Sequence, residues 1–441
     1  MSKSTRLMTL YTTFVLSCCL SSACAVARQD LPDGFAPIFN GEDLSGWYAI
    51  ETYNPREMAA MSEEDRAKTI EEATDATEEF WRVEDGEIVN DGRGPFLTYE
   101  KPLRDYELVI DYKTVALADS GVYLKATPQV QIWDYTEEGG KANLGALLGS
   151  GGLWNNSAGT PGKDPLELAD NPFGEWNRFF IRQIGARTSV WLNDKLVVDN
   201  AIMENYWDRS IPLINEGRIQ LQTHGGEIRW RNIGLREIPS EEANQLLAEI
   251  AGDGFEQVFN GEDFTGWSGP VDNYEVEDGC LRCKKGAGGT IYTDGEYTDF
   301  VARFEFKLPP GGNNGLAIRY PGEGDTAYVG MCELQVLDTE HEKFSGIDPR
   351  QAHGSAYGMV AAHRGYHRPT GEWNYQEVTV RGSTIKVELN GTVILDTDLG
   401  DVTEYMGGRP HPGKDRESGH FGFAGHSDPV EFRNVFIRSL N

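Results

Sequence analysis

The amino-acid sequence predicts an all-β protein made of two tandem antiparallel β-sandwiches. The first observation is internal repetition, because motifs in the first half of the 441 residues return in the same order in the second half. The second is the abundance of short segments rich in β-branched and aromatic residues, mostly bounded by Gly, Asn or Asp. The third is a hydrophobic fraction of 39%, which is enough for real cores and argues against bulk disorder.

The first 27 residues have the pattern of an export signal. Lys3 and Arg6 precede a mostly apolar stretch, and Ala25 and Ala27 supply the small residues of a cleavage site. Residues 1–27 are therefore predicted to be a signal peptide, and the protein is expected in the periplasm or outside the cell. Lipoprotein processing at Cys24 is the alternative. No later stretch reaches the roughly 18 apolar residues of a membrane span.

The repeat defines the domains. Residues 35–47 match residues 255–267 almost position for position, beginning with Phe and ending in Ser/Thr-Gly-Trp. Further along, Gly-Glu-Trp-Asn occurs at 174–177 and again at 371–374. Matches in constant order indicate two homologous domains. We place them at residues 34–238 and 254–441, joined by a linker over residues 239–253.

Two helical segments interrupt the strand pattern. Residues 55–79 of the first copy form an insertion rich in Glu and Ala with scattered Met and Ile, which predicts a helix acting as a solvated lid or brace. The linker opens with Pro239 and ends at Gly252, which predicts a short acidic helix. Elsewhere Asn390-Gly391, and Asn193-Asp194 at the matching place, predict tight hairpins. Each copy exceeds the roughly 100 residues of an immunoglobulin domain and fits a larger jelly roll.

The charge balance restricts the partners. The chain has 40 Lys and Arg against 70 Asp and Glu, a formal net charge of −30. A field of this sign repels phosphate backbones, so nucleic acid is not expected as a partner. Neutral substrates or cationic partners fit this composition.

Several motifs resemble a known family. They are Phe-Asn-Gly-Glu-Asp-Leu-Ser-Gly-Trp at 39–47, Gly-Val-Tyr-Leu-Lys at 121–125, Gln-Val-Gln-Ile-Trp-Asp at 129–134, Gly-Glu-Trp-Asn at 174–177, and Leu-Gln-Thr-His-Gly at 221–225 with a later Arg-Asn-Ile. Together they resemble the 3-keto-disaccharide hydrolase family, also described as 3-keto-glucoside 1,2-lyase and 3-keto-2-hydroxy-glucal hydratase, in two tandem copies. The resemblance implies a concanavalin A-like, glucanase-like jelly roll and net hydrolysis of 3-keto-glucosides or disaccharides.

The chemistry implied by this resemblance sets the residue types to look for. A ketone at C3 of a glucoside acidifies the hydrogen on C2. A base removes that proton while an acid protonates the leaving oxygen at C1, and water then adds back. Such a site needs a base, an acid, and a donor or cation for the developing enolate. Aromatic walls would hold the sugar.

The second copy offers candidates for these roles. Glu333 and Gln335 stand two apart on an apolar strand, so both point to one face. We expect Glu333 as base or metal ligand, Gln335 and Arg319 as substrate binders, and His426 as acid. Asp338, where the strand meets a loop, is a further catalytic candidate. A purely structural Glu–Arg pair is the alternative.

The first copy lacks the carboxylate. Gln129 stands where Glu333 stands in the second copy, so we expect an amide in place of the carboxylate on that face. Trp154 lies in a Gly/Asn-rich loop and is a candidate for stacking on a sugar ring. The remaining substrate-binding candidates are Lys125, Gln131, Asp134 and His224.

Two further possibilities stay open. A divalent metal could bind among the histidines of the second copy, where His363 and His367 have i,i+4 spacing, although Gly365 and Pro369 disfavour a helix there. The Cys280/Cys283 pair is interpreted as ordinary strand residues. A non-catalytic, lectin-like carbohydrate-binding protein and an ordinary retaining glycosidase are the competing functions, because this sandwich serves many activities.

Overall fold

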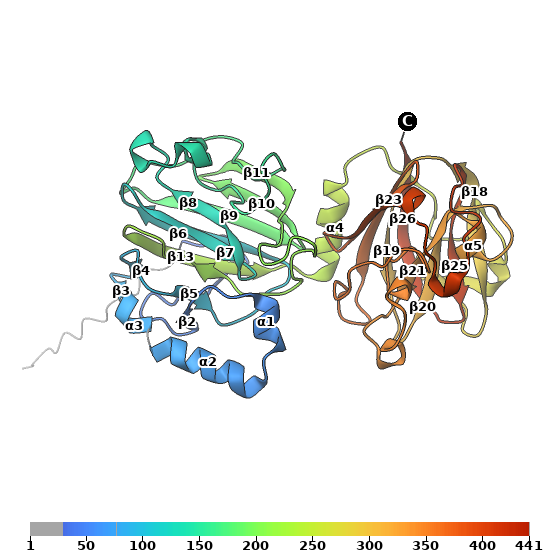
Figure 1. Ribbon diagram of the computed structural model, residues 1–441, viewed down its shortest axis with the longest axis horizontal. Helices are drawn as coiled ribbons and strands as arrows, with labels where there is room; N and C mark the ends of the chain where they lie inside the picture. Colours follow the sequence, from blue (N-terminus) through green and yellow to red (C-terminus); the bar gives the residue numbers. More distant parts are fainter. Residues whose placement is uncertain (1–29, 76, 441) are drawn as a thin grey trace, which may run out of the picture.

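The computed structural model describes residues 30–75 and 77–440, and these form two β-sandwiches side by side (Figure 1). The predicted signal peptide lies outside the described residues. Every strand pair is antiparallel, and each domain combines an 8-stranded sheet with a 5-stranded sheet. The predicted fold, two tandem jelly-roll sandwiches, is confirmed.

The first domain contains strands β1 to β13, arranged in two sheets. Its larger sheet contains, in order, β11 (Lys195–Ile202), β10 (Arg187–Leu192), β9 (Asn177–Ile184), β6 (Tyr106–Thr114), β13 (Ile228–Glu237), β4 (Glu87–Asn90) and β3 (Trp81–Glu84), with β1 (Ala36–Pro37) beside β13. Its smaller sheet contains β2 (Trp47–Ile50), β5 (Phe96–Tyr99), β12 (Gln220–Leu221), β7 (Asp119–Leu124) and β8 (Thr127–Trp133).

The second domain repeats this topology. Its larger sheet contains β16 (Tyr274–Glu277), β17 (Cys280–Cys283), β26 (Glu431–Ser439), β19 (Phe300–Lys307), β22 (Asn374–Arg381), β23 (Thr384–Leu389) and β24 (Thr392–Asp398), with β14 (Glu256–Gln257) beside β26. Its smaller sheet contains β15 (Trp267–Ser268), β18 (Gly288–Tyr297), β25 (Gly419–His426), β20 (Asn313–Tyr320) and β21 (Cys332–Leu337).

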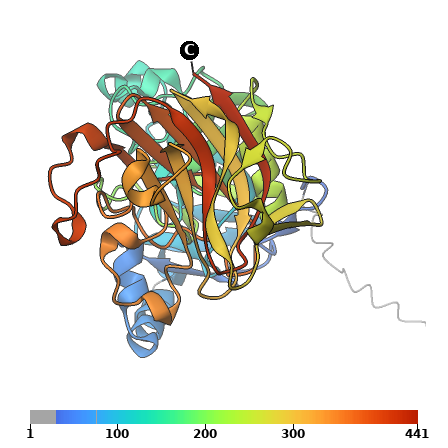
Figure 2. The same cartoon turned by 90° about the vertical axis from the view of Figure 1, so that its right-hand side faces the viewer.

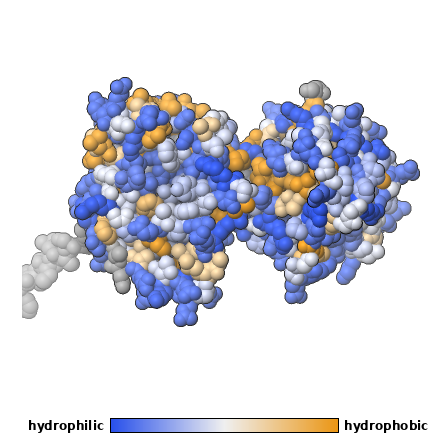
Figure 3. Space-filling model, in the orientation of Figure 1, coloured by the Kyte–Doolittle hydropathy of each residue, from blue (hydrophilic) through white to orange (hydrophobic). Residues whose placement is uncertain are grey.

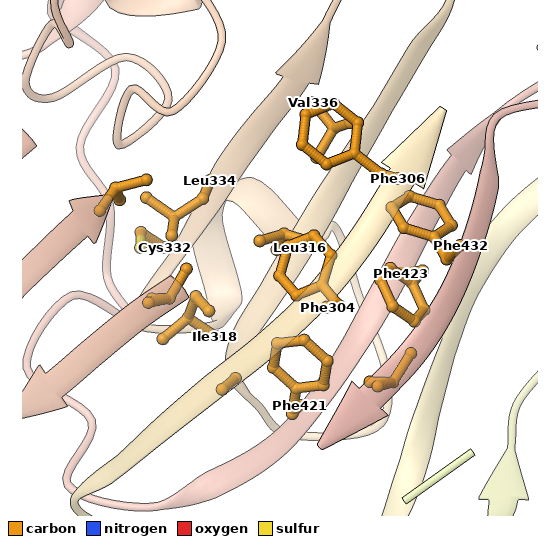
Figure 4. Close-up of a cluster of buried hydrophobic side chains, with 14 of the residues drawn as sticks. Phe304, Phe306, Leu316, Ile318, Cys332, Leu334, Val336, Phe421, Phe423 and Phe432 are labelled. Atoms are coloured by element: carbon orange, nitrogen blue, oxygen red, sulfur yellow. The ribbon is translucent and has the colours of Figure 1, made fainter. Parts of the chain in front are cut away.

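Each sandwich encloses its own core. On β9, alternate residues Asn177, Phe179 and Ile181 are buried, which is the period-2 pattern of a strand with one face inward. The core of the second domain is rich in Phe, and the rings of Phe423 and Phe432 stack with their centroids 4.0 Å apart. Figure 4 shows side chains from both sheets meeting in this core.

The insertion of the first domain is helical, as predicted, but divided into three helices. These are α1 (Pro55–Ala60), α2 (Glu63–Asp75) and α3 (Thr77–Phe80). Asn54 caps α1 by accepting a hydrogen bond from the backbone of Arg56, and Pro at the first helical position fits that start. Met58 packs against Tyr48 and Ile50 of β2. The insertion therefore braces the outer strand of the smaller sheet.

The linker helix α4 (Ser240–Ile250) packs between the domains (Figure 1). Its buried Leu247 shares an apolar cluster with Ile184 of the first domain and Tyr375 of the second. Gly252, with φ of 78°, follows the helix, as expected for a glycine that ends one. On the surface drawn in Figure 3, apolar residues gather at this boundary while most others are hydrophilic.

Direct polar contacts also join the domains. The Arg187 guanidinium donates to both oxygens of Glu388, one at 2.7 Å from Nη2, and the carboxylate is buried. From the insertion, Arg56 donates to the hydroxyl of Tyr366 at 3.3 Å. Figure 2 views the molecule from the side of the second domain, with the insertion helices below it. The two sandwiches are thus held in one orientation.

Candidate active site

Strand β21 directs the predicted Glu333 and Gln335 away from the core. Cys332, Leu334 and Val336 alternate with them and point into the apolar interior (Figure 4). Glu333 and Gln335 are nevertheless only 5% and 4% exposed, because loops cover this outer face of the smaller sheet. A buried carboxylate on the loop-covered face is costly unless it is partnered, so its partners define the site.

Glu333 reaches His426 across the intervening strand β20. The His426 Nε2 lies 3.3 Å from Glu333 Oε1, although β25 and β21 are separated by β20. The crossing point is Gly315, where a Cβ atom would lie 2.1 Å from the same oxygen. Only glycine at position 315 leaves room for the side chain of Glu333.

The carboxylate changes the proton affinity of its neighbour. The hydrogen bond with Glu333 raises the pKa of His426 above its ordinary value; burial opposes this shift, and attraction to the same carboxylate reinforces it. His426 is therefore the imidazolium over a wider pH range than a free histidine. Within the described residues, the second oxygen of Glu333 has no hydrogen-bond partner, so it is free to accept a proton.

The pair lies at the wall of a cavity of about 380 Å³. The cavity is lined both by charged and amide groups and by aromatic and aliphatic groups. Its lining residues are Asn313, Asp325, Ala327, Tyr328, Glu333, Gln335, Leu337, Phe344, Ile347, Gln351, Tyr357, Arg409 and His426. A polar cavity with apolar walls is the form of a small-molecule site.

Loops supply the cation and the aromatic walls of this cavity. Arg409 lies over the ring of Tyr328, 3.4 Å from its centroid, and pairs with Asp325 at 3.6 Å. On another wall, the Gln351 amide donates to the hydroxyl of Tyr357 at 3.2 Å. The sequence analysis missed these residues because they lie outside the strands, with Tyr328 on the four-residue helix α5 (Thr326–Val329), Gln351 on a 3-10 turn and the others in loops, where no periodicity indicates direction.

Amide groups organise the floor of the cavity. Gln335 Nε2 donates to Asn313 Oδ1 at 2.6 Å and to the carbonyl of Asn314 at 3.1 Å. Gln335 thus lines the cavity beside Glu333, as its position two residues further along the strand predicts. Its amide nitrogen is committed to strand β20.

Arg319 is not where the sequence led us to expect it. Its guanidinium donates to the carbonyls of Thr298, Gly382 and Arg416, each at 2.8 Å, and it lines a different cavity from Glu333. The backbone of Arg319 is left-handed, with φ of 48°, at the far end of β20 from Asn313. The alternative, a structural Glu–Arg pair, does not form either, because Arg319 pairs with Asp299, and Arg409 is the arginine that lines the site.

Asp338 is also separate from the cavity. Its Oδ2 accepts the backbone hydrogen of Gly311 at 2.9 Å, which ties the end of β21 to the neighbouring loop. Asp134 does the same in the first domain, where it accepts from the backbone of Leu117 and Thr136, each at 2.8 Å. Both aspartates thus hold loops at equivalent places.

In the first domain, a residue that the sequence analysis missed restores the carboxylate. Asp119 Oδ2 lies 2.9 Å from His224 Nδ1, and Asp119 Oδ1 accepts from Gln131 Nε2 at 2.8 Å. Lys141 forms an ion pair with the same carboxylate. The expectation that this face has lost its carboxylate is therefore wrong, although Gln129 does stand in the place of Glu333.

The other candidates of the first domain are divided. Lys125 is fully buried, donates to the carbonyl of Gly185 at 2.8 Å, and burial lowers its pKa to about 8, so it lies apart from His224. Trp154 does lie beside the site, because its backbone bonds to that of Gln129 just as Tyr357 bonds to Glu333. The ammonium of Lys163 covers its ring at 3.9 Å.

The histidines of the second domain do not converge. His363 lines a cavity between the domains, whereas His367 is buried, with its ring centroid 4.2 Å from that of His353. Burial lowers the pKa of His367 to about 4. Over residues 30–75 and 77–440, no three His, Cys, Asp or Glu side chains form a group able to hold a metal ion. Cys280 and Cys283 are buried and unpaired.

A β-sandwich with a loop-walled polar cavity and a paired carboxylate and imidazole defines a small-molecule site capable of acid–base chemistry. The chain belongs to the 3-keto-alpha-glucoside-1,2-lyase-like domain family, which matches residues 34–236 and again residues 254–438. The predicted family and its tandem duplication are thus confirmed.

Several individual proteins are similar to parts of this chain. A 3-keto-disaccharide hydrolase of Bacteroides thetaiotaomicron is 24% identical over 247 residues, which cover 47% of this chain and 85% of that protein. A solved candidate glycosyl hydrolase of Parabacteroides distasonis is 26% identical and covers 43% of this chain and 100% of its own, with a TM-score of 0.38. A carbohydrate-binding module, CBM66 of Bacillus subtilis, is 14% identical over 40% of this chain and 96% of its own, with a TM-score of 0.27.

The family and the named relative support a carbohydrate hydrolase-like function. A carbohydrate substrate is consistent with both. Where the structure describes the chain, none of its helices has the length and apolar character needed to cross a bilayer.

Proposed function

We propose that the second domain cleaves the glycosidic bond of a 3-keto-glucoside by elimination followed by hydration. The observation that carries the proposal is the contact of 3.3 Å between Glu333 and His426 at the wall of the 380 Å³ cavity. The hydrogen bond raises the pKa of the imidazole, so His426 keeps its second proton over a wider pH range than a free histidine. A base beside an acid is what reaction at two neighbouring carbons requires.

In the proposed elimination, the free oxygen of Glu333 takes the proton from C2 of the sugar. The C2–H electron pair forms the C1=C2 double bond and the C1–O bond breaks. The imidazolium of His426 gives its Nδ1 proton to the departing oxygen, because Nε2 faces Glu333. The products are a 3-keto-2-hydroxy-glucal and an alcohol. Addition of water places hydroxide on C1 and a proton on C2.

The negative charge of the intermediate needs a partner. It develops on the oxygen at C3, and Arg409 is the cation that lines the cavity in place of the predicted Arg319. A preorganised cation beside developing charge is a strong source of rate enhancement. Tyr328, Phe344 and Tyr357 are available to pack on the apolar face of the sugar ring. The predicted signal peptide supports the further proposal that the reaction occurs after export.

The decisive experiment compares an oxidised with an unoxidised sugar. Purified protein is incubated in D₂O with 3-keto-trehalose or trehalose, and release of glucose is followed. We expect turnover of the oxidised sugar alone, with deuterium on C2 of the 3-keto-glucose that forms on hydration, beyond a protein-free control. Turnover of trehalose would instead indicate a glycosidase. Binding of both sugars without turnover would indicate a lectin-like protein.

The site is tested by removing the base. Glu333→Gln keeps the shape of the side chain but abolishes its proton affinity, and we expect a loss of about 10²–10⁴-fold in turnover. Glu323→Gln, an exposed glutamate of the same domain, serves as the matched control. Full activity of the Glu333 variant would contradict the assignment of the base.

A further inference from the structure

The two domains place their carboxylate on different strands. In the second domain, Asn313 pairs with Leu337 across β20 and β21, and Glu333 stands four residues before Leu337. In the first domain, Asp119 occupies the place of Asn313 by the same pairing, because it lies opposite Trp133. The amide and the carboxylate have therefore exchanged strands between the copies.

This exchange alters which atoms are free. In the first domain, both oxygens of Asp119 are occupied, because Gln131 donates to one while His224 and Lys141 contact the other. In the second domain, one oxygen of Glu333 is unpartnered within the described chain. The first domain thus lacks the free carboxylate oxygen that proton removal requires.

The group in the place of the base cannot replace it. Gln129 is an amide, and amides do not take up protons at neutral pH. Its side chain is only 3% exposed, and its Oε1 has no hydrogen-bond partner although its amide nitrogen bonds to Gln131. Gln222 Oε1, on the segment whose backbone nitrogen donates to the carbonyl of Gly121, is also unpartnered. Buried acceptors without donors cost free energy, and a hydroxyl-bearing ligand would satisfy them.

The histidine presents the opposite nitrogen to the ligand. His224 turns Nδ1 to Asp119, whose carboxylate accepts, so Nδ1 donates and Nε2 faces away from the carboxylate. His426 instead turns Nε2 to its carboxylate. The side chain of His224 is 62% exposed, so its Nε2 is accessible to a sugar hydroxyl.

We propose that the first domain holds a second carbohydrate site, built on Asp119, His224 and Gln129, that binds a sugar without cleaving it. The ligand class is a neutral, hydroxyl-rich sugar, since the site offers unpartnered acceptors and a carboxylate already neutralised by Lys141. The inference rests on the proposed function only for the choice of the sugar. The experiment measures binding of the sugar, so it gives a result even if the second domain is inactive.

The test is calorimetric titration of 3-keto-trehalose into the full-length Glu333→Gln protein, which should not turn the sugar over. We expect two binding sites per chain. Adding His224→Ala should leave one site, and adding His426→Ala instead should leave the other. His224 is exposed, so its substitution should not disturb the fold, and Asp199→Asn, at an exposed carboxylate of the same domain, is the control that should leave both sites.

Two results would overturn the inference. One is a single site per chain that His224→Ala leaves unchanged. The other is turnover by the Glu333→Gln protein that His224→Ala abolishes, because the first domain would then be catalytic. Failure of the proposed function gives a different result, namely wild-type protein that binds the oxidised sugar without releasing glucose.

Discussion

Substitution of Gly315 by alanine should disable the second domain without unfolding it. The new Cβ would lie 2.1 Å from Glu333 Oε1 and 2.5 Å from Cδ, so the oxygen must retreat by about 1.3 Å to reach ordinary contact at 3.4 Å. A shift of about 1 Å in a catalytic group costs roughly 10²-fold in rate, which corresponds to about 2.7 kcal/mol of transition-state stabilisation. The clash falls on a flexible side chain, so the stability cost should stay near 1 kcal/mol.

The assay measures kcat with 3-keto-trehalose alongside a denaturant titration. Gly295→Ala is the matched control, because its Cβ would make only ordinary contacts, with the hydroxyl oxygen of Tyr297 at 3.5 Å and the ring carbon that bears it at 3.8 Å, and it lies outside the cavity. The Gly315→Ala protein should unfold near the wild-type midpoint and lose about 10²-fold in kcat. Wild-type kcat in a folded Gly315→Ala protein would refute the argument that this glycine allows Glu333 to reach His426.

Four further outcomes are expected. Activity should fall as pH rises through the raised pKa of His426, because the acid is then deprotonated. A variant without the Glu333 carboxylate lacks the group that raises this pKa, so its residual activity should fall at a lower pH than that of the wild type. Identical pH–rate profiles for the variant and the wild type would contradict this. Arg187→Ala leaves the buried Glu388 carboxylate without its ion-pair partner and should lower the free energy of unfolding by about 3–5 kcal/mol, measured by urea titration. A loss below about 1 kcal/mol would show that this ion pair does not stabilise the protein. Arg319→Met should lower the melting temperature while kcat/KM of the folded protein stays within a factor of about two, and a selective loss of kcat/KM would return Arg319 to the site. Exchanging Asp119→Asn and Gln129→Glu together should give the first domain a free carboxylate, so turnover should appear in a Glu333→Gln background; its absence would show that more than this carboxylate distinguishes the domains.

The sequence alone predicted those features that depend on strand periodicity, on alignment of the repeats or on turn residues. The period of two placed Glu333 and Gln335 on one face, and alignment of the repeats brought His426 and His224 to equivalent places. The Asn390-Gly391 hairpin formed as expected, with φ of 49° and 79° at its two residues. These features depend on neighbours in the chain or on the repeat.

The remainder depends on contacts that only the folded sheet defines. Arg319 was expected beside Glu333 because their strands pair, but its left-handed backbone turns the guanidinium to another cavity. Asp119 was missed because it compensates for Gln129 from a neighbouring strand, which requires the register of β7 and β8. Arg409 lies on a loop whose path the sequence pattern does not specify.

The firm attachment of the domains through α4 and the Arg187–Glu388 pair has a consequence for long glycans. In the proposed arrangement, the two sugar sites lie at a fixed distance from each other. A glycan bound at one site therefore has a high effective concentration at the other only when it is long enough to span that distance. Short sugars would gain nothing from the duplication. In the proposed arrangement, a glycan long enough to reach both sites would bind more tightly than one that reaches a single site.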